Sequence, residues 1–273
     1  MHKRHRLLIG ALLLASTSAL EARGGASAFV EDYTSAELHT RLASNCPVLL
    51  VFSGGTEATG PHIALGKHNL RVRAYAEAIA RRMDDALVAP VLPFAPNSPE
   101  LQRFPGTITL DDVTFSRVNE EVVRSMIASG FRSVALLSDH FNSQPILAEV
   151  ASRLDAEFKP KGARVFFVSD GYAKARQQIE AELKRAGRVP GGHGGFWDTA
   201  ETMAVRPAAV RPKEFRPGTV ADDGNGDLDA RGVSGDPSGA TAAMGRRFAA
   251  IRIRLASEQL RGLLRSAGQC PPR

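Results

Sequence analysis

Side chains that can bind a metal ion are concentrated in residues 54–69, which read GGTEATGPHIALGKHN. This glycine-rich stretch holds the carboxylate of Glu57 and the imidazoles of His62 and His68. Other imidazoles and carboxylates lie in later polar loops, namely Asp139, His140, His193 and Asp198. Mixed imidazole and carboxylate ligands suit zinc or manganese. The residue types therefore predict a metal site assembled from several loops.

Strand-like and helix-like segments alternate along the chain and would position these loops. Continuous apolar runs, typical of strands covered on both faces, occur at 46–52, 86–92, 133–138 and 163–169. Helical spacing of apolar residues predicts helices at about 69–83, 112–129, 145–158, 172–186, 198–206 and 240–266. This alternation predicts a single doubly wound α/β domain with a mainly parallel sheet between helices.

Three of the candidate loops directly follow predicted strands. Residues 54–62 follow the first strand, 93–100 the second and 138–142 the third. Ligands of open parallel sheets bind at the carboxyl ends of the strands, where such loops gather. The order of the elements thus supports one shared site at that edge.

The first 28 residues have the order of a secretory signal peptide. The basic segment MHKRHR precedes the apolar run LLIGALLLA, and small residues then continue to Ala28. We expect cleavage after Ala28, with Ala22 as the second choice and an uncleaved N-terminal anchor as the alternative. The mature domain would be residues 29–273, periplasmic or secreted, with no stable membrane anchor because no later apolar run is long enough to span a bilayer.

The charge and the two cysteines give further limits. About half of the net charge of +6 lies in the first 28 residues, so a nucleic-acid partner is not indicated. In an oxidising compartment Cys46 and Cys270 can form a disulfide. A buried, free Cys46 is the alternative.

Five motifs in order resemble those of the creatininase (creatinine amidohydrolase) family. GGTEATGPHIALGKH resembles GS-x-E-Q-H-G-P-H-L-P-x-x-T-D, and LPFAPNSPELQRFPGTITL resembles LPYG-x-S-x-E-H-x-x-FPGTISL. GFRSVALLSDHFNS, HGGFWDTAETMAVRP and GVSGDPSGATAAMGRRF resemble the three motifs that follow. The resemblance covers about residues 46–248. It implies a three-layer α/β/α fold, a hexamer or other homo-oligomer, and paired zinc or manganese ions that hydrolyse cyclic amides.

The resemblance also implies which residues bind the metal. Glu57 and His140 match family ligands, and Asp198 stands for a ligand glutamate. His68 replaces the aspartate that bridges the two ions, and Thr59 replaces a ligand histidine. Because a neutral imidazole has only one lone pair to offer, a bridge through His68 is lost. We therefore expect one ion per chain, bound by Glu57, His68, His140 and Asp198.

Catalytic and substrate-binding residues are predicted in the same way. His193 matches an active-site histidine that can carry a proton, and Asp139 is a second candidate for that role. His62, Ser98 and Trp197 are the predicted substrate-binding residues, whereas Leu101 replaces a family histidine.

Two functions remain open at this point. The first is an exported metal-dependent amidohydrolase of a small cyclic amide or a related C–N bond other than a peptide bond. The second is a catalytically inactive binding or structural protein with the same fold, which the replacements at Thr59, His68 and Leu101 favour.

Overall fold

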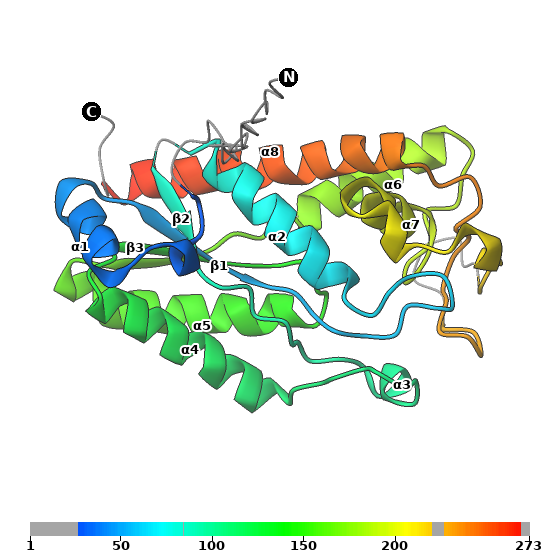
Figure 1. The fold of residues 1–273 in the computed structure, drawn as a ribbon, viewed down its shortest axis with the longest axis horizontal. Coiled ribbons are helices and arrows are strands. Elements are labelled where there is room, and N and C mark those ends of the chain that lie inside the picture. The colour runs from blue at the N-terminus through cyan, green and yellow to red at the C-terminus, as the bar shows by residue number, and fades with distance from the viewer. Residues whose placement is uncertain (1–26, 84, 220–226, 269–273) are drawn as a thin grey trace, which may run out of the picture.

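The computed structural model describes residues 27–83, 85–219 and 227–268 (Figure 1). The described residues form four strands and eight α-helices. Four short 3-10 helices, Val30–Asp32, Lys159–Lys161, Pro207–Ala209 and Pro212–Glu214, complete the regular structure of the described residues.

The four predicted strands form one parallel sheet. They are β1 (Val48–Ser53), β2 (Ala86–Val88), β3 (Ser133–Ser138) and β4 (Arg164–Phe167), in the order β2-β1-β3-β4. Each pair is parallel, with β1 and β3 in register from Val48 opposite Ser133. β2 is shorter than the predicted run of 86–92, because Pro90 has no N–H to donate to a ladder.

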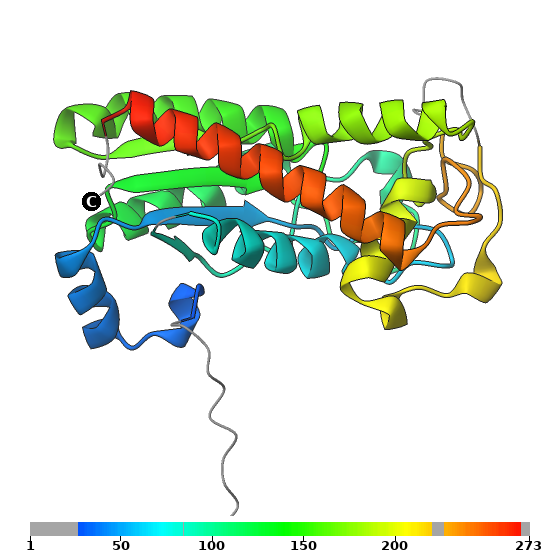
Figure 2. The same ribbon diagram turned by 90° about the horizontal axis from the view of Figure 1, so that it is seen from above.

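Helices cover both faces of this sheet, so the predicted three-layer α/β/α fold is confirmed (Figures 1 and 2). One layer contains α2 (Lys67–Ala80) and α8 (Ala242–Ser266), and the other contains α4 (Asp112–Ala128) and α5 (Ser143–Phe158). α6 (Ala173–Arg185) and α7 (Phe196–Val205) pack with α8. The short α1 (Ser35–Ser44) and α3 (Pro99–Gln102) lie outside these layers.

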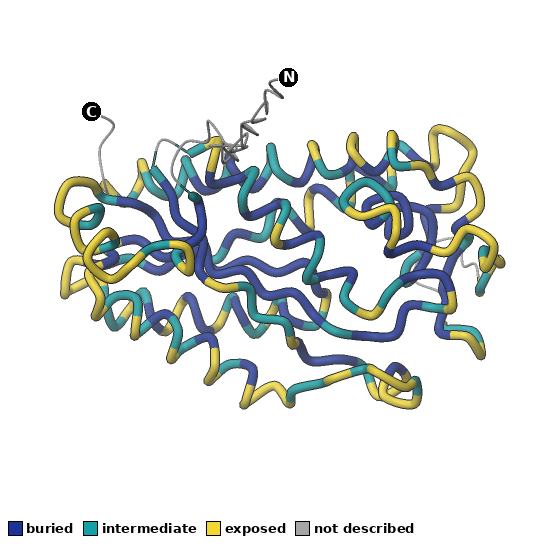
Figure 3. The backbone as a smooth tube through the Cα atoms, in the orientation of Figure 1, coloured by how far each residue is buried: buried dark blue, intermediate teal, exposed yellow. Residues whose placement is uncertain are grey.

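Alternation along β1 explains why helices are needed on both faces. Leu50 belongs to the core on the α2 and α8 side, whereas Leu49 and Val51 belong to the core on the α4 and α5 side. All three side chains are fully buried, and the tube in Figure 3 shows the sheet as the buried centre of the molecule. An unbroken apolar strand is stable only when both of its faces are covered.

Local signals set the ends of several helices where the sequence predicts them. The carboxylate of Asp111 accepts a hydrogen bond from the backbone N–H of Thr114 at 2.9 Å, which caps α4. Gly130 follows the helix with φ +115°, a conformation that side-chain-bearing residues rarely adopt. These local signals set where α4 begins and ends.

Several predictions about the termini fall wholly or partly outside the described residues. Residues 1–26 and Cys270 are among those not described, so the signal peptide and the Cys46–Cys270 disulfide stay predictions. Ala28 is buried, and its carbonyl accepts a hydrogen bond from the N–H of Val88 at 2.7 Å. Cleavage after Ala22 would keep this contact. No helix within the described residues is long and apolar enough to cross a membrane.

Candidate metal site

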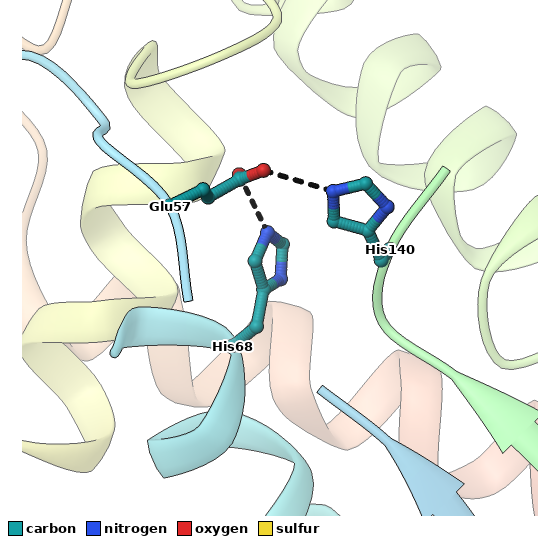
Figure 4. Close-up of side chains that lie close together, drawn as sticks. All are labelled: Glu57, His68 and His140. Carbon is teal, nitrogen blue, oxygen red and sulfur yellow. Dashed lines mark hydrogen bonds and ion pairs between the residues drawn. The ribbon is translucent and has the colours of Figure 1, made fainter. Parts of the chain in front are cut away.

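Three buried side chains from distant parts of the sequence converge at the carboxyl edge of the sheet (Figure 4). Glu57 lies in the loop after β1, His68 in the first turn of α2, and His140 in the loop after β3. The Nε2 atoms of His68 and His140 lie 2.9 Å and 2.8 Å from separate oxygens of the Glu57 carboxylate. These three are the only group of this kind that the described residues provide.

The geometry fits a small divalent cation. One ligand atom from each residue lies within 4.8 Å of the others, so a single ion can reach all three. The Nε2 atoms now face the carboxylate that would share the ion with them, and an ion would take the place of their protons. Two imidazoles and one carboxylate leave a coordination position open, as in catalytic zinc sites.

The ring of His68 is held from its other side. Its Nδ1–H donates to Asp139 at 2.8 Å, and Asp139 also accepts a hydrogen bond from Nε of Arg71 at 2.8 Å. A carboxylate behind a ligand histidine orients the ring and keeps Nδ1 protonated, so that Nε2 is the nitrogen presented to an ion. Asp139 is therefore placed to orient His68.

This position does not suit the proton transfer predicted for Asp139. Burial alone would raise the pKa of its carboxyl, but the charge of Arg71 and the hydrogen bond from His68 outweigh burial and lower it. A carboxylate that stays ionised and is already shared by two donors is a poor proton carrier. The geometry thus favours a positioning role for Asp139.

Replacement of Asp139 by asparagine tests that role. We expect Asp139→Asn to weaken binding of Zn²⁺ by about 10- to 100-fold, because the neutral amide holds His68 less firmly and lowers its basicity. The affinity can be measured by competition with a chromophoric chelator. Asp112→Asn, on the exposed side of α4, is the matched control. An affinity unchanged in a folded Asp139→Asn protein would contradict the assignment.

The carboxyl of Glu57 is ionised, as a metal ligand requires. Glu57 is 1% exposed, and burial would raise the pKa of its carboxyl. Electrostatic interactions with His140 and Lys67 outweigh burial and hold that pKa well below its usual value. Since metal ligands must be deprotonated, the protein has already met this requirement at Glu57.

Asp198 does not join the cluster, contrary to its predicted role as a ligand. One of its oxygens accepts from Nζ of Lys67 at 2.6 Å and from the backbone N–H of Gly194 at 2.9 Å, and the other accepts from Arg71 at 2.5 Å. Both oxygens are thus already bound to cations or N–H donors. Burial would raise the pKa of Asp198, but Lys67 and Arg71 hold it well below its usual value.

His193 lies beside the cluster with one nitrogen available. Its Nε2–H donates to the carbonyl of Ala58 at 2.7 Å, so Nδ1 is the unprotonated nitrogen of the neutral ring. Nδ1 lies 3.5 Å from an oxygen of Glu57. Burial and the charge of Lys67 lower the pKa of His193 to about 4, so the ring is neutral at pH 7. The predicted proton carrier is therefore in a form that accepts a proton.

A cavity of about 360 Å³ opens next to these groups. Ser98 and Trp197, two of the predicted substrate-binding residues, belong to its lining, as do His193 and Leu101. The third, His62, does not: it is fully buried, and its Nε2–H donates to the carbonyl of Gly194 at 2.9 Å. His62 instead supports the loop that contains His193, because that loop has few side chains of its own to pack.

Three functional candidates were not predicted from the sequence. Nζ of Lys67 contacts Glu57 and Asp198. Arg71 donates hydrogen bonds to Asp139 and Asp198. Asn97 lies 3.0 Å from Nε2 of His140. Lys67 precedes the helix predicted from about residue 69, and only the structure places it in the first turn of α2, where a cation opposes the helix dipole. Arg71 carried no signal, because a lone arginine in a helix is usually exposed.

Comparison with known proteins agrees with this architecture. The family model described as "Creatininase: Creatinine amidohydrolase" matches residues 31–260. The creatinine amidohydrolase of Pseudomonas putida is 26% identical over 197 residues, which are 67% of this chain and 74% of that protein. The mycofactocin precursor peptide peptidase of Mycobacterium tuberculosis is 27% identical over 235 residues, 78% of this chain and 84% of that protein.

Solved structures show the same fold. A structure titled "Creatininase Mn" aligns with a TM-score of 0.70 over 90% of this chain and 100% of that chain, at 22% identity. A crystal structure of creatinine amidohydrolase aligns with a TM-score of 0.73 over 91% and 100% of the two chains, also at 22% identity. At 22% identity, these alignments show that the fold is shared and nothing further about function.

Proposed function

Because the chain belongs to the creatininase family, we propose that it hydrolyses the C–N bond of a small cyclic amide, or of a related substrate, with one zinc or manganese ion per chain. The observation that carries the proposal is the convergence of Glu57, His68 and His140 on one point beside a cavity. When bound there, the ion would polarise the substrate carbonyl and make a water molecule more acidic.

The residues of the chain provide the remaining steps. His193 accepts a proton from the attacking water through Nδ1 and passes it to the nitrogen of the broken C–N bond. The carbonyl of Ala58 fixes the tautomer that this transfer requires. Ser98 and Trp197 line the cavity and would contact the substrate there. Asp139 keeps His68 in place throughout.

A linear peptide is the second candidate substrate. The relatives named mycofactocin precursor peptide peptidase align over a larger share of this chain than the creatinine amidohydrolase does. Phe141, at the edge of the cavity, is 66% exposed and offers an apolar contact to a substrate longer than a single ring. The catalytic groups would be the same for both substrates.

The signal-peptide pattern and the family resemblance support a proposal about where and in what form the protein acts. We propose that the protein acts outside the cytoplasm, in the periplasm or as a secreted enzyme, and that it forms a homo-oligomer. Neither proposal is needed for the chemistry of the site.

Metal analysis of the purified protein tests the proposed function. After loading with Zn²⁺ or Mn²⁺ and removal of excess ion, we expect about one ion per chain, because the described residues provide one group of three converging ligands. The loaded protein should hydrolyse a member of a panel of small cyclic amides and short peptides. Fewer than about 0.2 ions per chain would favour an inactive binding protein instead, and about two tightly held ions would contradict the single-ion site.

A further inference from the structure

Lys67 is a buried lysine at a position where lysine is unfavourable. It is the first residue of α2 and only 1% exposed. A buried ammonium loses its hydration, and the partial positive charge of the helix N-terminus repels it. Negatively charged groups in the site must compensate for the lost hydration and for the repulsion by the helix.

The compensation comes from two carboxylates rather than one. Nζ of Lys67 lies 2.6 Å from Asp198 and 3.3 Å from Glu57. Arg71 also pairs with Asp198, so the charge of Asp198 is balanced without Lys67. The contact of Lys67 with Glu57 is therefore a second feature that needs its own explanation. Lys67 therefore shares Glu57 with the metal ion proposed above.

The ammonium occupies the space between two carboxylates that could otherwise attract a second cation. Two ionised carboxylates on the wall of one cavity attract cations, and Glu57 and Asp198 are such a pair. With Nζ between their oxygens, another ion would meet a full positive charge within hydrogen-bond range of its ligands. Within the described residues, the position between Glu57, His68 and His140 is then the one group of converging ligands that stays open to an ion.

We propose that Lys67 is a built-in second cation of the active site, which limits the protein to one exchangeable metal ion and stabilises negative charge on the substrate. This inference rests on the proposed function. An ammonium has three N–H donors, and the described contacts of Lys67 use two carboxylates. Lys67 lines the cavity, so the third donor is available to the carbonyl oxygen of the substrate.

The charge of Lys67 matters at one step of the hydrolysis. The oxygen of water bonds to the carbonyl carbon, and the carbonyl oxygen gains the electron pair of its π bond. When the C–N bond breaks, that pair returns, and the nitrogen leaves with the proton that His193 took from the water. Lys67 keeps its own proton throughout and stabilises the oxygen only while it is negative, which lowers the barrier.

Replacement of Lys67 by methionine or glutamine separates this role from a structural one. Both variants remove the charge and keep most of the length of the side chain. We expect each to bind Zn²⁺ at least about tenfold more tightly, since a repelling charge is gone and Glu57 is released. We also expect kcat to fall by about 100-fold or more with little change in KM. Affinity for Zn²⁺ is measured by competition with a chelator. The kcat is measured on the substrate that the panel of cyclic amides and short peptides identifies.

Opposite changes in metal affinity and kcat are the signature of the proposal. A lysine that only supports the fold would lower both when replaced, and an unchanged or weaker affinity in a folded variant would overturn the inference. Two ions in the wild-type protein would also overturn it. No ion in the wild-type protein would overturn the proposed function first, and the inference with it. Lys161→Met, at an exposed lysine, is the control and should change neither quantity.

Discussion

His140→Ala is expected to remove the bound metal ion and to lower hydrolysis by about a thousandfold, the equivalent of about 4 kcal/mol of transition-state stabilisation. His140 supplies one of the three converging ligands, and its Nε2 faces Glu57 at 2.8 Å. Alanine leaves one imidazole and one carboxylate, too few to hold the ion against a chelator. Metal content by mass spectrometry and kcat/KM on the identified substrate measure the two effects.

A matched control uses a histidine far from the site. His39 lies exposed on α1, and His39→Ala should leave both the metal content and the activity as they are. A folded His140→Ala protein that retains its full complement of metal would contradict the site proposed here. Circular dichroism of each variant shows whether it is folded.

Arg71→Met is expected to cost about 3–5 kcal/mol in the free energy of unfolding, the largest loss of stability that we predict. Arg71 is fully buried and donates to Asp139 at 2.8 Å and to Asp198 at 2.5 Å. Methionine fills similar space but leaves both buried carboxylates with one cation fewer. Urea denaturation followed by circular dichroism measures the loss.

An exposed ion pair near the other end of the same helix provides the comparison. Arg81 pairs with Glu77 at 2.7 Å, and both side chains are more than 40% exposed. Because water and salt screen such a pair, Arg81→Met should change the free energy of unfolding by less than about 0.5 kcal/mol. If Arg71→Met cost no more than Arg81→Met, the buried network would not hold the site together.

The sign of the pH dependence follows from the same contacts. The pKa of Asp198 in the folded protein lies well below its unfolded value of about 3.9, because Lys67 and Arg71 outweigh the cost of burial. Its contribution to stability is therefore complete above about pH 4 and is lost as the pH falls toward the folded pKa. The difference between wild type and Arg71→Met should be largest near pH 7 and shrink in acid.

Much of the site was predictable because local pattern and topology act together. Glu57 and His140 follow apolar strands, and parallel strands end at a common edge, so their approach follows from the order of the elements. His68 comes from the helix that packs beside them. The motifs indicated the family, and the family model confirms it over residues 31–260.

The exceptions are residues whose role depends on a distant partner. Asp198 and Asp139 have the chemistry of a ligand and a proton carrier, yet Arg71 and Lys67 occupy their oxygens. His62 has the same imidazole as His68, but it packs under the loop at Gly194 instead of facing the cavity. No spacing within one segment reveals such pairings.

The sequence by itself determined the strands, the helices, the parallel sheet and the loops that carry the ligands, because apolar periodicity and caps are local properties. Only the tertiary structure decided which carboxylates remain open to a metal ion. Lys67 and Asp198 lie 131 positions apart, and their contact at 2.6 Å exists only after α2 and α7 have packed together. A buried charge without a partner is costly, so charged side chains in a buried site form ion pairs. The tertiary structure determines which side chain becomes the partner of each.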